Sequence, residues 1–78
     1  HHRLQVRGEL TPEGGGIRIT GEIAGPFKVT WYDAAGRQLR EERHETGRDF
    51  VLRPPGVRPG CMALLVDGLG RVGAAVSP

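Results

Sequence analysis

Residues 27–39, FKVTWYDAAGRQL, decide the fold of this chain. The first six residues alternate apolar and polar side chains, which is the period of a half-buried β-strand. The next four, DAAG, are turn formers, and Gly36 can take the positive φ that a tight hairpin needs. The stretch therefore predicts two antiparallel strands joined by a hairpin, the second of them over residues 37–45.

Period-two alternation continues on both sides of this hairpin. Apolar side chains recur at every second position in residues 4–6, 17–23, 50–52, 62–66 and 72–76, and Gly or Pro clusters separate these runs. The pattern predicts an all-β fold, an antiparallel immunoglobulin-like β-sandwich of about seven short strands. We interpret residues 3–78 as one such domain, and we find no internal repeat in it.

The composition of two of these runs predicts their positions in a sheet. Residues 62–66 are the most apolar run and are expected at the centre. Residues 37–45 hold a single apolar side chain, Leu39, and are expected at an edge, where their charges oppose pairing with another chain. A polar edge strand of this kind favours a monomer.

Length and composition limit the class of protein. Gly and Pro account for 13 and 6 of the 78 residues, which excludes a helical bundle or a coiled coil. A chain this short has a thin core, which counts against an independent enzyme. The single cysteine, Cys61, excludes an internal disulfide and a multi-cysteine zinc site. No apolar run is long enough to span a bilayer.

The N-terminal residues carry no information about the fold. We interpret His1 and His2 as the remnant of a purification tag, and we expect the chain to be a fragment of a longer protein. The sequence contains no secretory signal peptide.

Two motifs suggest enzymes but have simpler interpretations. Residues 68–73 spell G-x-G-x-x-G, yet a dinucleotide site needs a helix after this motif, and a strand is predicted there. Asp33 and Asp67 could form the carboxylate pair of a glycosidase. Each precedes turn residues, however, where Asp side chains bind local backbone amides, so we predict turn roles for both.

Possible metal, thiol and nucleic-acid sites are also explained structurally. Glu42 and His44 share a strand face, but a metal site needs three or four ligands. Cys61 has no nearby His to generate its thiolate, so an inert thiol is expected. Acidic residues interleave with six arginines between residues 37 and 58, which favours ion pairing over phosphate binding. These arginines are Arg37, Arg40, Arg43, Arg48, Arg53 and Arg58. We predict no cofactor, no metal and no nucleic-acid partner.

Trp31 and Tyr32 are adjacent on a predicted strand and therefore point to opposite faces. Trp31 shares the face of Phe27 and Val29 and is expected in the core. Tyr32 is then the aromatic residue most open to a partner, and it could stack on a sugar ring.

Three segments together resemble one protein family. Residues 27–39 resemble the pattern V-x-V-Y-D-x-x-G-R-x-V, and residues 58–66, RPGCMALLV, resemble x-P-G-x-Y-x-V-x-V. Residues 70–76 resemble the short final strand that follows a glycine turn. Over residues 17–78 the chain therefore resembles the C-terminal sorting domain of type IX secretion in Bacteroidetes-type bacteria. It departs from the family pattern at Met62, where an aromatic residue is usual, and it lacks the terminal Lys.

The resemblance implies a non-catalytic, seven-stranded module attached to a larger secreted protein. It implies export through the periplasm and the outer membrane to the cell surface. The implied partners are the sorting machinery of the outer membrane and a surface polysaccharide or lipopolysaccharide. The residues that the resemblance marks for recognition are Tyr32, Asp33, Gly36, Arg37, Pro59, Gly60, Arg71, Val72 and Val76.

Two other functions stay open. A small carbohydrate-binding module would use Tyr32 as its stacking residue. A structural immunoglobulin-like spacer would need no binding residue at all.

Overall fold

The computed structural model describes residues 3–12, 15–56 and 60–76 of the chain. The strands are β1 (Val6–Leu10), β2 (Ile17–Ile23), β3 (Phe27–Tyr32), β4 (Gln38–His44), β5 (Gly47–Leu52), β6 (Met62–Asp67) and β7 (Val72–Val76). These residues contain no helix that could cross a membrane.

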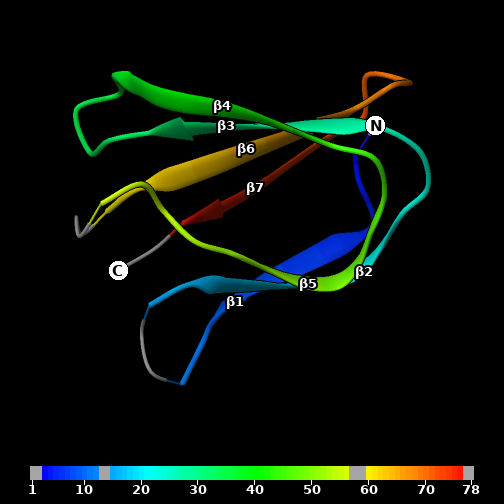
Figure 1. The fold of residues 1–78 in the computed structure, drawn as a ribbon, viewed down its shortest axis with the longest axis horizontal. Helices are drawn as coiled ribbons and strands as arrows, with labels where there is room; N and C mark the ends of the chain where they lie inside the picture. The colour runs from blue at the N-terminus through cyan, green and yellow to red at the C-terminus, as the bar shows by residue number, and fades with distance from the viewer. Residues whose placement is uncertain (1–2, 13–14, 57–59, 77–78) are drawn as a thin grey trace.

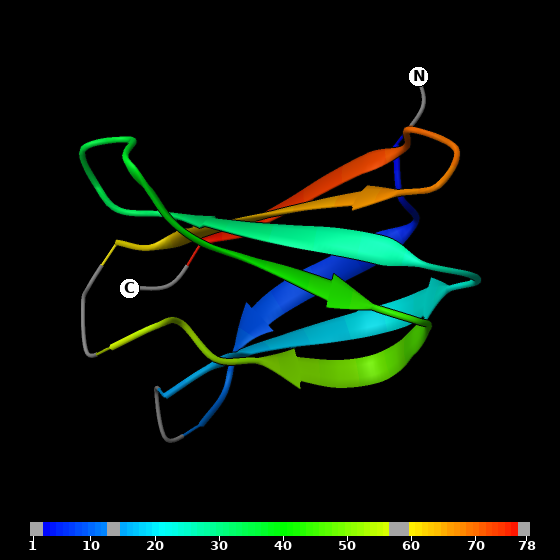
Figure 2. The same ribbon diagram turned by 45° about the horizontal axis from the view of Figure 1, so that its top comes forward.

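The strands form two antiparallel sheets that face each other as a sandwich (Figure 1). One sheet has the order β1-β2-β5 and the other has the order β4-β3-β6-β7. The second view shows how the chain crosses from one sheet to the other after β2, β4 and β5 (Figure 2). This arrangement confirms the predicted all-β immunoglobulin-like sandwich. It also confirms the central position of residues 62–66 and the edge position of β4.

Alternate side chains of the central strands build the core between the sheets. They come chiefly from β2, β3 and β6, and Trp31 is the largest fully buried side chain. The buried apolar residues are Leu4, Ile17, Ile19, Ile23, Phe27, Val29, Trp31, Leu52, Cys61, Ala63 and Leu65. The expectation that Trp31 lies in the core with Phe27 and Val29 is confirmed.

The inner face of β4 is charged although it borders the core. Arg40, Glu42 and His44 lie directly opposite Trp31, Val29 and Phe27 of β3, so they point to the same side of the sheet. The Glu42 carboxylate accepts hydrogen bonds from three of these side chains. The donors are the Trp31 indole at 3.2 Å, the Arg40 guanidinium at 2.6 and 3.0 Å and the His44 ring at 3.1 Å.

Aromatic rings complete this side of the sandwich. The His44 ring stacks on Phe27 at a centroid distance of 5.0 Å, and Phe50 of β5 lies 5.5 Å from Phe27. Inward-pointing charge and aromatic packing together cover the side between β4 and β5, where the two sheets are not hydrogen-bonded to each other.

β2 contains a bulge at Gly21. The pairing of β2 with β5 changes register between Ile19 and Glu22. Gly21 has a φ of +124°, and a Cβ at this position would lie 2.8 Å from the carbonyl oxygen of Gln5. The Asp49 carboxylate accepts a hydrogen bond of 2.9 Å from the Gly21 N–H. Only glycine meets both the conformational and the spatial requirement here.

We expect Gly21→Ala to lower the free energy of unfolding by about 1–2 kcal/mol, because a Cβ is disfavoured at this φ and clashes with Gln5. The matched control is Gly25→Ala. Gly25 also has a positive φ, of +95°, but a Cβ there would meet nothing within 4 Å. Urea unfolding measures both variants. Equal costs at the two positions would contradict a role for the close approach of the Gln5 carbonyl.

Candidate recognition surface

The hairpin between β3 and β4 is organised by the side chain of Asp33. One carboxylate oxygen accepts 2.9 Å hydrogen bonds from the backbone N–H groups of Ala35 and Arg37. The other accepts a 3.0 Å bond from Arg37 Nε. Gly36 has a φ of +86° and its N–H bonds the Asp33 carbonyl at 2.9 Å. The predicted turn is confirmed, and an ion pair joins the Arg37 guanidinium to the Asp33 carboxylate.

The hairpin between β6 and β7 repeats this turn. Asp67 stands 34 residues after Asp33, and both begin the sequence D-x-x-G-R. One Asp67 oxygen accepts from the N–H groups of Leu69 and Arg71 at 3.0 and 2.8 Å, and the other accepts from Arg71 Nε at 2.7 Å. Gly70 has a φ of +80°. The expectation that the chain has no internal repeat is therefore wrong for its two hairpins.

The two hairpins are related by an approximate twofold axis through the sheet. β3 and β6 pair antiparallel around Thr30 and Leu64, and each carries its own edge strand on the outside. Asp67 lies opposite the first residue of β3, whereas Asp33 follows its last residue. The two D-x-x-G-R turns therefore lie at opposite ends of the sheet. A comparison of the sequence with itself at an offset of 34 would have found them.

Five of the residues marked by the resemblance gather at the end of the sheet that holds Asp33. Tyr32, Asp33, Gly36 and Arg37 form the end of β3 and the turn. Gly60 lies beside this turn, because a Cβ on it would be 3.3 Å from the Cβ of Ala34. Pro59 lies outside the described residues.

The remaining marked residues lie along β7. Arg71 and Val72 are at the opposite end of the sheet, where Arg71 belongs to the second turn. β7 then runs back until Val76 pairs with Met62, which pairs in turn with Tyr32. The side chain of Val76 is outside the described part of the structure. The backbone row Tyr32–Met62–Val76 nevertheless brings the end of β7 to the signature turn.

The outer face of the sheet is apolar over β6 and β7. Met62, Leu64 and Val66 alternate on this face and are half-buried. Val72 is 40% exposed beside Val66, and Leu69 at the tip of the second turn is 78% exposed. Tyr32 of β3 is half-buried on the outer side, whereas the other two aromatic residues of this strand, Phe27 and Trp31, are buried.

The structure shows the predicted turn roles of Asp33 and Asp67 and the predicted strand after the glycine turn of residues 68–70. The glycines of residues 68–73 form a turn followed by a strand. Asp33 and Asp67 are at opposite ends of the sheet and serve as turn residues. Cys61 is fully buried. The described residues hold no cluster of three or more His, Cys, Asp or Glu side chains suited to a metal ion.

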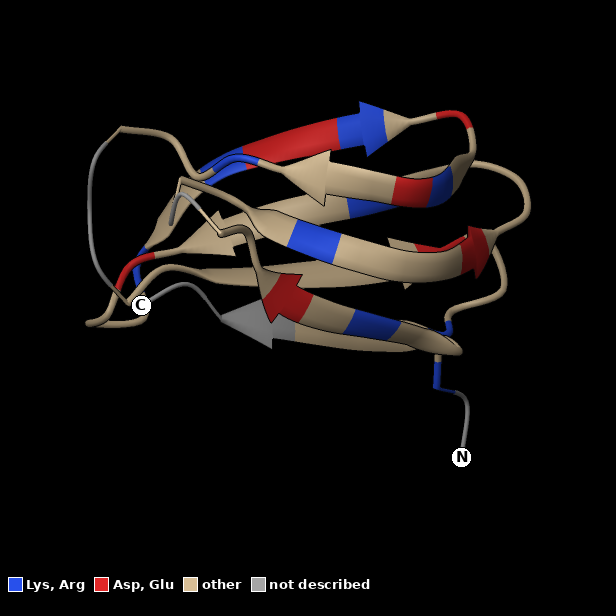
Figure 3. Cartoon of the chain, turned by 90° about the horizontal axis from the view of Figure 1, so that it is seen from below, with Lys and Arg blue, Asp and Glu red and all other residues tan. Residues whose placement is uncertain are grey.

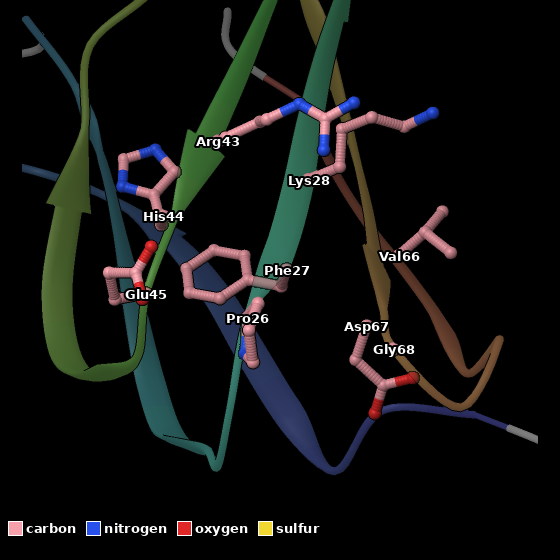
Figure 4. Close-up of a pocket in the computed structure, with 9 residues that line it drawn as sticks. All are labelled: Pro26, Phe27, Lys28, Arg43, His44, Glu45, Val66, Asp67 and Gly68. Carbon is pink, nitrogen blue, oxygen red and sulfur yellow. The ribbon is translucent and has the colours of Figure 1, made fainter.

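A shallow hollow of about 360 Å³ lies where the β6–β7 turn meets the start of β3. Figure 4 shows the side chains of Lys28 and Arg43 extending along one side of it, with Glu45 and Asp67 on other parts of the lining. Asp67 is already bound by Arg71. The charged groups that the hollow offers to a ligand are therefore mixed in sign.

The arginines are distributed among acidic partners. Arg37 pairs with Asp33 at 3.0 Å and Arg40 with Glu42 at 2.6 Å. Arg48 lies opposite Glu22 across the β2–β5 pair. The strand banded red and blue at the top of Figure 3 is β4, where acidic and basic side chains follow each other directly. Arg58 lies outside the described residues.

No family model, curated protein or solved structure matches the chain.

Both turn carboxylates are expected to make stability depend on pH in acid. Hydrogen bonds from Arg37 lower the pKa of Asp33 below 3.8. Burial opposes ionisation of Asp67, but hydrogen bonds from Arg71 and Leu69 outweigh it and lower its pKa as well. Because these pKa values fall on folding, the stabilisation is present above pH 3.8 and is lost as the pH falls through the folded values.

The test compares wild type with Asp67→Asn by urea unfolding between neutral pH and about pH 2, which lies below the ordinary pKa of an Asp carboxyl. We expect the variant to be less stable at neutral pH and the difference to shrink in acid, where the wild-type carboxyl is protonated. A difference that stays constant over this range would contradict an electrostatic role of Asp67.

Proposed function

We propose that this chain is a non-catalytic sorting module that directs export and cell-surface attachment of a larger secreted protein. The observation that supports the proposal is that six of the nine marked residues lie at one end of the sheet, while Arg71 and Val72 lie at the other end. The signature turn, Gly60 and the backbone row from Tyr32 to Val76 lie at one end of the four-stranded sheet. A sorting module needs such a folded, recognisable surface and no active site.

Arg37 is the side chain at this end best presented to a partner. It is 80% exposed, yet its Nε is held by Asp33 at 3.0 Å. The Asp33 contact uses only the Nε, so the two outer nitrogens of the guanidinium can contact a ligand, and this planar fork suits a carboxylate or phosphate group. Such groups occur on an outer-membrane receptor and on a charged surface polysaccharide, the two partners of the proposal.

The proposal is tested by export of a reporter. The chain is fused behind a signal peptide and a fluorescent protein in a Bacteroidetes-type host that has the type IX machinery. We expect surface fluorescence with the intact chain and its loss on deletion of residues 72–78. Export that is unaffected by this deletion would contradict the proposal.

Point variants separate recognition from folding. Arg37→Glu reverses the exposed charge of the signature turn and is expected to reduce surface export. The matched control is Arg7→Glu on β1, an exposed arginine of the other sheet. Circular dichroism verifies that both variants keep the fold. Equal export by the two variants would remove the turn from the proposed recognition surface.

A further inference from the structure

We infer that the outer edge of β7 is a docking site for one extended strand of a partner protein, which adds to the sheet through backbone hydrogen bonds. This inference deepens the proposed function and rests on it for the partner's role in sorting. The edge itself follows from the geometry of the strands, and it does not depend on the proposed function.

The approximate twofold axis makes β4 and β7 equivalent edges of the same sheet, but the two are built differently. β4 contains Arg40, Glu41, Glu42 and Arg43, and its register shifts at Leu39, where it carries an extra residue. Charges and bulges of this kind prevent another strand from pairing. β7, with the sequence VGAAV, has no charge and pairs with β6 without a register shift.

The other sheet provides a second comparison. Its edge strands also carry charges: Arg7 and Glu9 in β1, and Arg48 and Asp49 in β5. Asp49 in addition has a φ of +48°, which interrupts a regular strand edge. Among the four edge strands of the described residues, β7 is thus the one without a charged side chain.

The backbone groups of Ala74 point toward this open edge. Asp67 N–H bonds the Arg71 carbonyl in the turn, so Arg71 and then every second residue of β7 face β6. Val72 faces the other way, and its carbonyl accepts a 3.0 Å bond from Leu4 N–H. Ala74 is two residues further on and has the same orientation. In the described residues no strand pairs with β7 beyond this contact at Val72.

The side chains beside this edge indicate the chemistry of the partner strand. Val72 and Ala74 are exposed on the outer face, next to Val66 and Leu64 of β6. A strand added to β7 would place alternate side chains over this apolar face. The expected partner is therefore an extended segment with apolar residues at every second position on that side.

A second copy of the chain fits this edge less well. Antiparallel pairing of two β7 strands around Ala74 would place Val76 of one copy opposite Val72 of the other. That position is occupied by Arg3 and Leu4, which lie beside Val72 in the fold. A peptide from another protein can end before Val72, and it then avoids Arg3 and Leu4.

The test uses a synthetic peptide with the sequence of residues 62–66 between terminal lysines, because this sequence already pairs with β7 in the fold. It is titrated into the isotope-labelled chain and followed by NMR. We expect saturable shifts and slowed hydrogen exchange at the Ala74 amide, and none at the edge amides of β4. An unchanged Ala74 amide at millimolar peptide, or shifts elsewhere only, would overturn the inference.

Variants of Ala74 make the test specific. Ala74→Pro removes an N–H that the β6–β7 ladder does not use, and proline is tolerated at such edge positions. We expect it to weaken peptide binding about tenfold, the loss of one well-formed backbone hydrogen bond. Ala74→Thr keeps the N–H and should bind as wild type. Ala74→Lys, which also keeps the N–H, replaces the proline variant if that does not fold, and its charge should weaken binding.

Two further measurements decide between the alternatives. Sedimentation that shows concentration-dependent dimers, abolished by Ala74→Pro, would overturn the assignment of a foreign strand in favour of a second copy. If the Ala74→Pro fusion no longer binds the peptide but is exported at the wild-type level, strand pairing at the β7 edge has no role in sorting. Peptide binding by a chain that fails to export would overturn the proposed function and leave the docking site supported.

Discussion

Trp31→Ala is expected to cause the largest loss of stability of any single substitution in the core. Trp31 is fully buried and is the largest side chain of the core. Replacing a buried aromatic residue by alanine costs about 3–5 kcal/mol, through lost burial and the cavity left behind. A domain of this size has a total stability of roughly 4–12 kcal/mol, so this single change removes a large part of it.

Far-UV circular dichroism with urea unfolding measures this effect, because the variant lacks the only tryptophan and its fluorescence. Trp31→Phe is the matched control. It keeps an aromatic ring in the core and removes the indole N–H that binds Glu42 at 3.2 Å. We expect the phenylalanine variant to fold with a smaller loss of stability. A cooperative transition of wild-type stability in Trp31→Ala would show that the sandwich does not depend on this side chain.

Period-two alternation was sufficient to predict the sandwich and six of its strands. It was wrong for the first strand, expected at residues 4–6, because β1 runs over Val6–Leu10 and is mostly exposed, so it has no buried apolar face to produce the pattern. Residues such as Ile17, Ile19 and Val29 are buried where the pattern placed them. The positions of β4 and β6 followed from charge and from apolar content, because an edge strand contacts water and a central strand does not. The turn at Asp33 followed from the local chemistry of Asp and Gly.

Features that depend on contacts between distant strands were not predictable in this way. β4 was expected to be a polar edge strand, but the pattern did not predict that its register against β3 turns Arg40, Glu42 and His44 toward the core side. The register shift at Leu39 decides this, and alternation within β4 alone does not reveal it. The turn at Asp67 was predicted, but its likeness to the Asp33 turn was not, because the two turns share only Asp, Gly and Arg and their flanking strands differ in size and polarity.

The twofold relation also explains why the candidate surface divides into two parts. Each hairpin contributes one turn and one edge strand, so the two turns lie at opposite ends. The two edges differ in charge: β4 carries Arg40, Glu41, Glu42 and Arg43, whereas β7 carries no charged side chain. A partner that reads the Asp33 turn and the end of β7 together would therefore contact both hairpins at a single end of the sheet.

Glu42→Ala is expected to lower the free energy of unfolding by roughly 2–3 kcal/mol, the range for hydrogen bonds to a charged acceptor. It removes the carboxylate that binds Arg40 and His44, and it leaves the indole N–H of the buried Trp31 without its acceptor. Glu42→Gln retains an acceptor oxygen and should cost less. Urea unfolding at neutral pH compares the two, and equal losses would argue against the importance of the indole contact.

The effect should also depend on pH and on Trp31. Burial opposes ionisation of Glu42, but hydrogen bonds from His44, Arg40 and Trp31 outweigh it and lower the pKa below 4.5, so its stabilisation is present above pH 4.5 and is lost in acid. In a Trp31→Phe background there is no indole N–H that could lose its acceptor. Glu42→Ala should therefore lower the free energy of unfolding by about 1 kcal/mol less than it does in wild type. The double-mutant cycle measures this coupling directly. Strictly additive effects would mean that Glu42 stabilises β4 through Arg40 and His44 alone, and that the contact between the charged edge and the core contributes nothing.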